Sequence, residues 1–268
     1  MSEYLQFRLK SSGQRTVVVS FLVAATVALG VVGPATAWAD DDRGLKAVPF
    51  EFVGTAAQCA PSPAGSRIVT AKWLRGMGLP DNGGQNTTPS DLTTNPNKKD
   101  RHSGLLLSKN GPTPDCSSSG ARILGVKGIV VTPTFAVGYD YRKGGHCGAG
   151  APRFNIDTNQ GFFFVGCANA PNSPAPQDPD QWTRTRSVIT TCGSECFPAS
   201  IPAGSTINSI NIIFDEGTDT ANNDTEGVGL AVLDNIFING VLITRGPGKD
   251  HHDGKDHGDD DDDDDNKD

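Results

Sequence analysis

Two runs in the second half of the sequence alternate apolar and polar residues, and this alternation constrains the fold most. In the run 207–214, Ile210, Ile212 and Phe214 fall on every second position. In the run 230–238 the same spacing is shared by Leu230, Val232, Ile236 and Ile238. Side chains of a β-strand alternate between two faces, so both runs are predicted to be half-buried strands that share one core.

Shorter runs of similar character occur through the rest of the chain. They predict strands at 48–53, 67–74, 104–108, 121–131, 135–141, 153–157, 161–165 and 182–188. Glycine and proline separate these runs, and nothing after residue 39 has helical periodicity. The sequence therefore predicts an all-β fold, a single jelly-roll-type antiparallel β-sandwich with long loops, the longest at 75–103.

The N-terminal segment has the pattern of an export signal. Basic residues precede an apolar run at 16–32, which is followed by the small-residue motif Ala37-Trp38-Ala39. A retained membrane anchor is the alternative, but a run of 17 residues is short for a span. We therefore expect a secreted or cell-envelope protein with no membrane span after cleavage. The predicted organisation is a signal peptide at 1–39, a flexible leader at 40–47, a β-sandwich domain at 48–245 and a disordered acidic tail at 246–268.

All six cysteines follow the predicted signal peptide. An even number in an exported chain favours disulfides, although six cysteines allow fifteen pairings. Zinc binding would require a second close pair or added histidines, and only one close pair is present. The spacings suggest the pairs Cys192 with Cys196, Cys147 with Cys167 and, by elimination, Cys59 with Cys116.

The net charge of -8 is concentrated at the C-terminus. Residues 250–268 contain 11 Asp and two Lys, whereas residues 40–249 contain 18 basic and 19 acidic residues. The near-neutral domain lacks the basic excess that binds nucleic acid, so no nucleic-acid partner is expected. The tail could attract divalent cations, or it could only keep the protein soluble.

Residues 182–188 form an unusual strand candidate, because Trp182, Arg184 and Arg186 share one face. A face that carries two arginines is a poor core stripe and suggests ligand binding. Carbohydrate sites combine aromatic rings with a few polar groups. The candidate rings are Trp73, Tyr139, Tyr141 and Trp182, with core packing as the alternative for each.

Acidic residues between and within the two long runs offer a possible structural calcium site. Hard cations bind several carboxylate and carbonyl oxygens on flexible loops. The candidate ligands are Asp215, Glu216, Asp219, Asp224 and Asp234. Solvated loop carboxylates are the alternative, and Asp234 could instead be buried with hydrogen bonds, because it lies among apolar residues.

A hydrolase is a weaker interpretation of the same residues. His146 and Asp140 could belong to a catalytic triad, but the sequence lacks a nucleophile elbow. Asp215 and Glu216 are adjacent, so on a continuing strand they would point to opposite faces and could not flank one glycosidic bond. We therefore expect a protein that is not an enzyme.

Several segments together resemble a known group of domains. These are Trp182 with its alternating Thr and Arg, the motif at 201–205, the run 207–214 and the motif Val-Leu-Asp-Asn-Ile-Phe-Ile-Asn-Gly at 232–240. Over residues 48–243 the chain resembles the jelly-roll sandwiches of carbohydrate-binding modules and galactose-binding-like domains, and it is similar to uncharacterised exported bacterial proteins. The resemblance implies a non-catalytic protein that binds a glycan or another cell-surface ligand. The alternatives are a cell-envelope or matrix structural protein whose tail binds divalent cations, and a secreted hydrolase.

Overall fold

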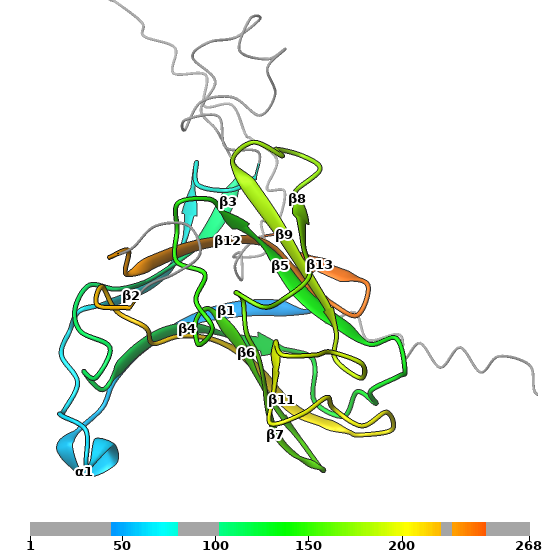
Figure 1. Cartoon of the computed structure of the whole chain (residues 1–268), viewed down its shortest axis with the longest axis horizontal. Coiled ribbons are helices and arrows are strands. Elements are labelled where there is room, and N and C mark those ends of the chain that lie inside the picture. The colour runs from blue at the N-terminus through cyan, green and yellow to red at the C-terminus, as the bar shows by residue number, and fades with distance from the viewer. Residues whose placement is uncertain (1–43, 80–101, 221–226, 245–268) are drawn as a thin grey trace, which may run out of the picture. The chain divides into compact units, whose positions relative to one another are not determined.

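The computed structural model describes residues 44–79, 102–220 and 227–244, which form two antiparallel β-sheets that do not close (Figure 1). The predicted signal peptide, the acidic tail and Asp224 lie outside the described residues. Within the described ranges the all-β prediction is confirmed, since the single helix has four residues.

The first sheet contains β1 (Lys46–Val53), β4 (Ser117–Leu124), β6 (Arg153–Thr158), β7 (Gly161–Val165), β10 (Cys196–Phe197) and β11 (Ile207–Phe214). Its order is β1-β4-β11-β6-β7-β10. The second sheet contains β2 (Val69–Arg75), β3 (Ser103–Lys109), β5 (Ala136–Arg142), β8 (Asn172–Pro174), β9 (Trp182–Val188), β12 (Leu230–Ile238) and β13 (Val241–Ile243). Its order is β2-β3-β12-β5-β9-β8, and β13 pairs with β12.

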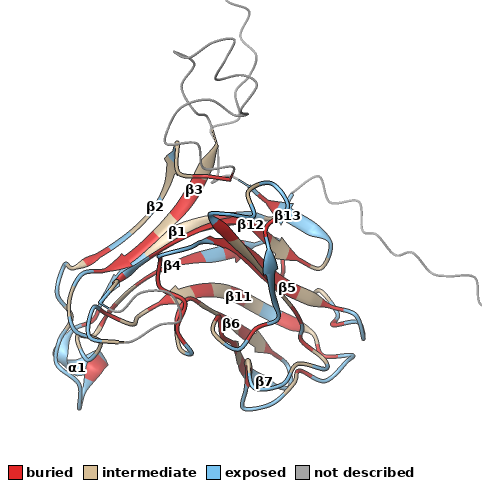
Figure 2. Ribbon diagram, turned by 45° about the horizontal axis from the view of Figure 1, so that its top comes forward, coloured by how far each residue is buried: buried red, intermediate tan, exposed pale blue. Residues whose placement is uncertain are grey.

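The main core lies between the sheets, where inward residues of both layers are buried (Figure 2). In β11 the residues Ile210, Ile212 and Phe214 are fully buried, as their spacing predicts. They belong to one cluster with residues of the other sheet, including Leu105 and Leu233. The two sheets therefore share a hydrophobic interior, which gives a β-sandwich-like arrangement.

The predicted face of β12 is wrong for its first half. Leu230 is exposed, and Val232 packs in a separate small cluster on the outer side of the sheet. A register shift between Asp234 and Phe237 in the pairing with β5 marks a bulge, and Asn235 there has φ 45°. Because an extra residue reverses the alternation, the core receives Ala231 and Leu233 before the bulge and Ile236 and Ile238 after it.

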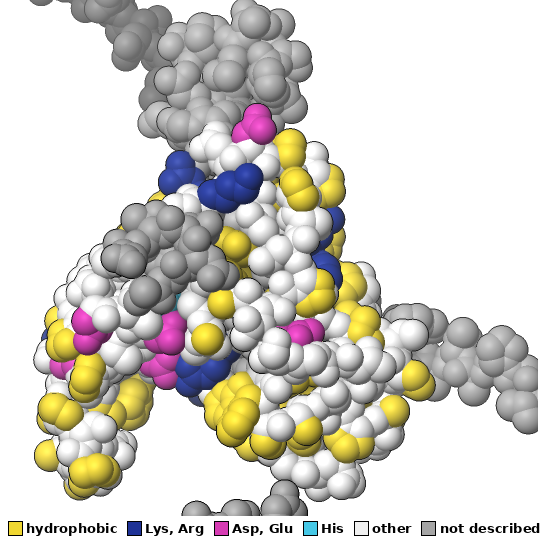
Figure 3. Space-filling view, viewed as in Figure 1, with side chains coloured by type: hydrophobic (Ala, Val, Ile, Leu, Met, Phe, Trp, Pro, Cys, Tyr) yellow, Lys and Arg dark blue, Asp and Glu magenta, His cyan; other side chains and the backbone are white. Residues whose placement is uncertain are grey.

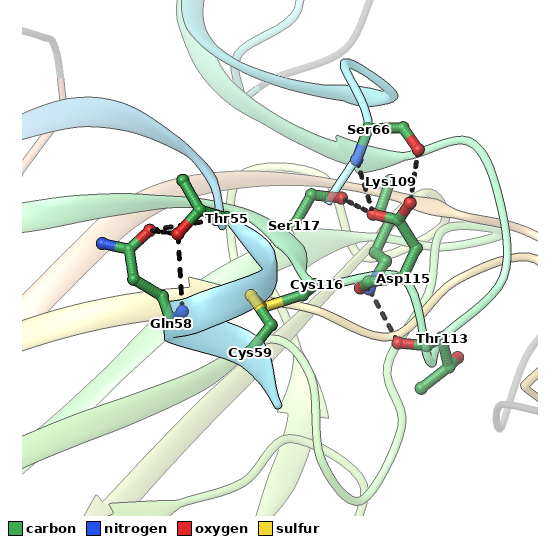
Figure 4. Close-up of a disulfide and its surroundings, with 9 residues drawn as sticks. All are labelled: Thr55, Gln58, Cys59, Ser66, Lys109, Thr113, Asp115, Cys116 and Ser117. Atoms are coloured by element: carbon green, nitrogen blue, oxygen red, sulfur yellow. Dashed lines mark hydrogen bonds between the residues drawn. A yellow bond between two sulfur atoms is a disulfide. The ribbon is translucent and has the colours of Figure 1, made fainter. Parts of the chain in front are cut away.

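The helix α1 (Ala56–Cys59) corrects the prediction that the domain has no helix. Thr55 caps it, and the Gln58 side chain accepts a hydrogen bond from the Thr55 backbone N–H, so the pair forms a capping box. Cys59 at its end is disulfide-bonded to Cys116 (Figure 4). A local cap and a disulfide therefore stabilise a helix too short to show apolar periodicity.

Three disulfides connect the pairs that the spacing suggested. Cys59 is bonded to Cys116, Cys147 to Cys167, and Cys192 to Cys196. The second bond joins the loop after β5 to the segment after β7, so it links loops from the two sheets. Three disulfides are consistent with a non-cytoplasmic protein.

Candidate functional site

The outer face of the six-stranded sheet carries one continuous row of side chains that points away from the core. Pairing places Phe197 beside Phe164, Phe164 beside Asn155, Asn155 beside Asn211 and Asn211 beside Arg122. The alternate residues of these strands are buried, so this row is on the outer side. With neighbouring strands about 4.8 Å apart, the row extends for roughly 20 Å.

One end of this row is an exposed aromatic patch formed by Phe162, Phe164 and Phe197. The Phe162 and Phe164 ring centroids are 5.1 Å apart, and those of Phe164 and Phe197 are 6.2 Å apart. Phe162 is 47% exposed and Phe197 is 67% exposed. Single exposed apolar residues are ordinary, but rings in mutual contact on a solvent-facing sheet make a candidate interaction surface. Hydrophobic side chains gather near β6 and β7 in Figure 3, next to basic and acidic side chains.

Arg153 adjoins the aromatic patch and is held in place on several sides. Its guanidinium carbon lies 5.4 Å from the Phe164 ring centroid, which is within cation–π range. Its Nη1 and Nη2 donate to the two carboxylate oxygens of Asp215 at 2.6 and 2.8 Å, and its Nε donates to Asn155 Oδ1 at 3.0 Å. The patch is therefore bordered by a fixed guanidinium and an amide.

Asp215 and Glu216, proposed from the sequence as calcium ligands, bond to different partners. Asp215 binds Arg153, whereas Glu216 Oε2 lies 2.7 Å from Nε2 of the fully buried His146. The Gly150 N–H donates to Glu216 Oε1 at 3.2 Å, and a Cβ at Gly148 would overlap with Glu216 Oε2. The glycine-dense loop at 142–152 thus allows the backbone to enclose one carboxylate.

The other candidate calcium ligands are also dispersed. Asp219 Oδ1 accepts from the N–H and Oγ1 of Thr113, both at 2.7 Å, which lowers the Asp219 pKa. Asp234 lies on β12 and is buried with hydrogen bonds, which was the alternative for it. The described residues contain no group of three or more His, Cys, Asp or Glu that could hold a metal ion. Calcium binding stays a prediction.

A buried lysine, Lys109, lies next to the segment after β11 that carries Asp215, Glu216 and Asp219. Lys109 Nζ donates to the backbone oxygens of Thr113, Asp115 and Asp215 at 2.8, 2.6 and 2.9 Å. Figure 4 shows Lys109 beside Thr113 and Asp115 near the Cys59–Cys116 bond. Burial lowers the Lys109 pKa, and nearby Asp215 and Asp115 oppose this shift. All three ammonium donors are used, so this lysine holds neighbouring loops together.

The hypothetical pairing of His146 with Asp140 is wrong. His146 contacts Glu216, whereas Asp140 binds Arg184 on the neighbouring strand through Nε at 2.8 Å and Nη2 at 2.9 Å. Arg186 Nη2 lies 3.4 Å from the same carboxylate. The two arginines named from the sequence therefore meet a buried acid on the outer face of the seven-stranded sheet.

The aromatic rings chosen from the sequence are mostly interior. Trp182 is fully buried in a cluster with Leu79, Ala175 and Val232. Tyr139 and Tyr141 are buried in the main core, and Tyr139 Oη donates to the Pro152 carbonyl at 2.7 Å. Trp73 is partly buried against that core, and its Nε1 donates to the Ala47 carbonyl at 3.0 Å. The structure therefore places all four rings in packing contacts, which was the alternative considered for each of them.

The sequence pattern does not single out the exposed patch, because it places Phe162 and Phe164 only in a strand and predicts no strand at Phe197. The Gly-Phe-Phe-Phe-Val run at 161–165 contained a partial signal, since alternation separates Phe163 from Phe162 and Phe164, so a strand with one core face must leave at least one phenylalanine on its outer face. Phe197 had no comparable signal. It lies in the two-residue strand β10, and its position follows from pairing with Phe164.

Comparisons with known proteins add no family to this description. The chain matches no protein-family model, no curated protein and no solved structure. None of the helical structure in the described ranges is long and apolar enough to cross a membrane. Function is therefore inferred from the chemistry of the described residues.

Proposed function

We propose that this chain is a secreted, non-catalytic protein that binds glycan through the outer face of its six-stranded sheet. The observation that carries this proposal is the exposed patch of Phe162, Phe164 and Phe197, bordered by Arg153 and Asn155. Export is supported by the signal-like pattern at 1–39 and by the three disulfides.

The chemistry of this face suits a sugar. A pyranose has an apolar C–H surface that stacks on an aromatic ring, and its rim of hydroxyl groups needs hydrogen-bond partners with fixed orientation. Asn155 and Asn211 both donate and accept, whereas Arg122 donates only. Because these residues lie on adjoining strands in the same row as Phe164, one ligand can contact both kinds of group.

The strand order supports a jelly-roll fold. Eight strands, taken as β3, β4, β5, β6, β7, β9, β11 and β12, occupy the orders β3-β12-β5-β9 and β4-β11-β6-β7. This arrangement corresponds to two interlocked Greek keys, the architecture found among lectin domains. Fold analogy is only a secondary argument, because one fold serves many functions.

A non-catalytic role is supported by how the acid and base candidates are used. His146 and Glu216 bind each other, and Asp215 is occupied by Arg153. Asp140, the other acid considered, is fully buried beneath two arginines. These groups have partners that keep the fold together, so the proposal assigns none of them a catalytic step.

A glycan array probed with the purified exported protein tests the proposal. We expect binding to a subset of glycans, and we expect Phe164→Ala and Phe197→Ala each to weaken it by about tenfold or more, as for central contact residues. Leu242→Ala is the matched control, because Leu242 is 51% exposed on β13 of the other sheet. No binding above background, or equal loss in the control, would contradict the proposal and favour a structural protein of the cell envelope.

A further inference from the structure

Arg184 and Arg186 form a guanidinium pair on the outer face of the seven-stranded sheet. They lie two residues apart on β9, so both side chains project to the same side. Both reach Asp140, and Arg186 is also positioned by its donation from Nη1 to the Thr185 carbonyl at 2.6 Å and by Phe237, whose ring centroid is 4.9 Å from its guanidinium carbon. The pair is therefore held rigidly before any ligand arrives.

The positive charge of this pair exceeds the negative charge that it contacts. Two guanidiniums share the single carboxylate of Asp140, which also accepts from Asn235 Nδ2 at 2.8 Å. Asp234 on β12 lies opposite Asp140 on β5. Its carboxylate accepts hydrogen bonds from the backbone N–H groups of Leu79 and Asn235 at 2.8 and 2.6 Å, and not from the two arginines. Burial raises the pKa of Asp234 to about 7, so its negative charge is only partly present at neutral pH.

The pair also has hydrogen-bond donors to spare. Asp140 occupies Nε and Nη2 of Arg184, while Thr185 and Asn235 accept from Nη1 and Nη2 of Arg186. Among the described residues, Arg184 Nη1 and Arg186 Nε have no hydrogen-bond partner. The two side chains are 27% and 23% exposed, so solvent reaches them. Burial lowers the Arg186 pKa to about 10, and Arg184 adds to this shift while Asp140 opposes it. The hydrogen bond to Asp140 raises the Arg184 pKa.

We propose that Arg184 and Arg186 form a binding site for an oxyanion, a sulfate or carboxylate group. Guanidinium groups with free donors suit such anions, because they provide fixed charge and directed N–H groups together. An anion would supply the missing negative charge at a place where the two arginines are already partly removed from water. This site lies on the opposite sheet from the aromatic patch and does not depend on glycan binding there.

A sulfate titration of the full chain tests the site. Sodium sulfate replaces sodium chloride at constant ionic strength, and NMR follows the Arg Nε–H signals. We expect the Arg186 Nε–H signal to shift with saturation, and Arg186→Gln to weaken the binding seen at the Arg184 signal by about tenfold or more. The control is Arg67→Gln, which removes an exposed arginine elsewhere and should leave sulfate binding unchanged.

Two further measurements complete the test. Arg186→Lys keeps the charge but loses the planar guanidinium, so this variant should bind sulfate with an affinity between those of the wild type and Arg186→Gln. It also keeps the proposal testable if Arg186→Gln does not fold. A sulfated monosaccharide that binds more tightly than sulfate would assign the site to an anion carried on a glycan, and equal affinity would assign it to a small free anion. Shifts no larger in sulfate than in chloride, or equal binding by the wild type and Arg186→Gln, would overturn the proposal.

Discussion

The outer faces of the two sheets use similar residues in opposite ways. On the six-stranded sheet, Phe197 is 67% exposed, and Arg153 lies beside the aromatic patch. On the seven-stranded sheet, Trp182 is fully buried among packing neighbours, and Asp140 is fully buried beneath two arginines. One face therefore presents its aromatic rings, and the other covers its ring and buries an acid.

The cause of this difference is what covers each sheet. Leu79, which follows β2, and Ala175, which follows β8, pack over Trp182 on the seven-stranded sheet. Once water is excluded, the polar groups below need partners within the protein, as the contacts of Asp140 and Asp234 show. The aromatic row of the other sheet has no such requirement, so its phenylalanines can be changed with little effect on the fold.

The largest expected effect is on stability when Asp140 is replaced. Asp140→Ala leaves Arg184 and Arg186 facing each other without their shared carboxylate, and we expect a loss of about 3–5 kcal/mol in the free energy of unfolding. The control is Asp157→Ala, which removes a half-buried acid on the outer face of the six-stranded sheet and should cost less than about 0.5 kcal/mol. Urea unfolding measures both, and similar costs would contradict the distinction between the faces.

The sequence predicted those parts of the fold in which local pattern and burial agree. The alternation of Ile210, Ile212 and Phe214 identified their buried face, and the cysteine spacing gave the three disulfides. The predicted strand 121–131 was too long. The structure ends β4 at Leu124, and Gly125 and Gly128 have φ of 85° and 88°, a conformation that turns the chain and that glycine adopts readily.

The candidate sites were harder to predict because they depend on tertiary contacts. No sequence pattern gives the bulge at Asn235, which places Val232 outside the main core. Pairing between distant strands brings Phe197 to Phe164 and Asp140 to Arg184. The arginines of 182–188 were correctly separated from the core, but the burial of Trp182 depends on Leu79 and Ala175, which lie in loops.

The second-largest expected effect is a pH dependence of the free energy of unfolding, which comes from Asp234 on the outer face of the seven-stranded sheet. The folded-state pKa of Asp234 is raised to about 7 from an ordinary 3.8, mainly by burial, with Asp140 adding to the shift. The folded protein therefore retains this proton at higher pH than the unfolded chain does. The resulting stabilisation is fully present below about pH 4 and is lost as the pH rises through about 7.

Unfolding free energies of the wild type and Asp234→Asn, measured from pH 4 to pH 8, isolate this effect. We expect the wild type to lose on the order of 2–4 kcal/mol relative to the variant across this range, because the asparagine cannot ionise. Asp140, Arg184 and Arg186 lie nearby but are common to both proteins, so their contributions largely cancel. A constant difference across the range would show that Asp234 is ionised throughout.

The smallest effect is expected for the exposed aromatic face, and it separates ligand binding from folding. Phe197→Ala should change the free energy of unfolding by less than about 0.5 kcal/mol, because most of the ring is already in water. Phe163→Ala is the matched control, since Phe163 is 7% exposed on the core side of β7 and its truncation should cost about 3–5 kcal/mol. Thermal unfolding of both variants measures the contrast. If Phe197→Ala proved as destabilising as Phe163→Ala, the Phe197 ring would serve packing, and the patch would no longer be evidence for ligand binding. If stability is unchanged while glycan binding falls, the ring contributes to ligand binding alone.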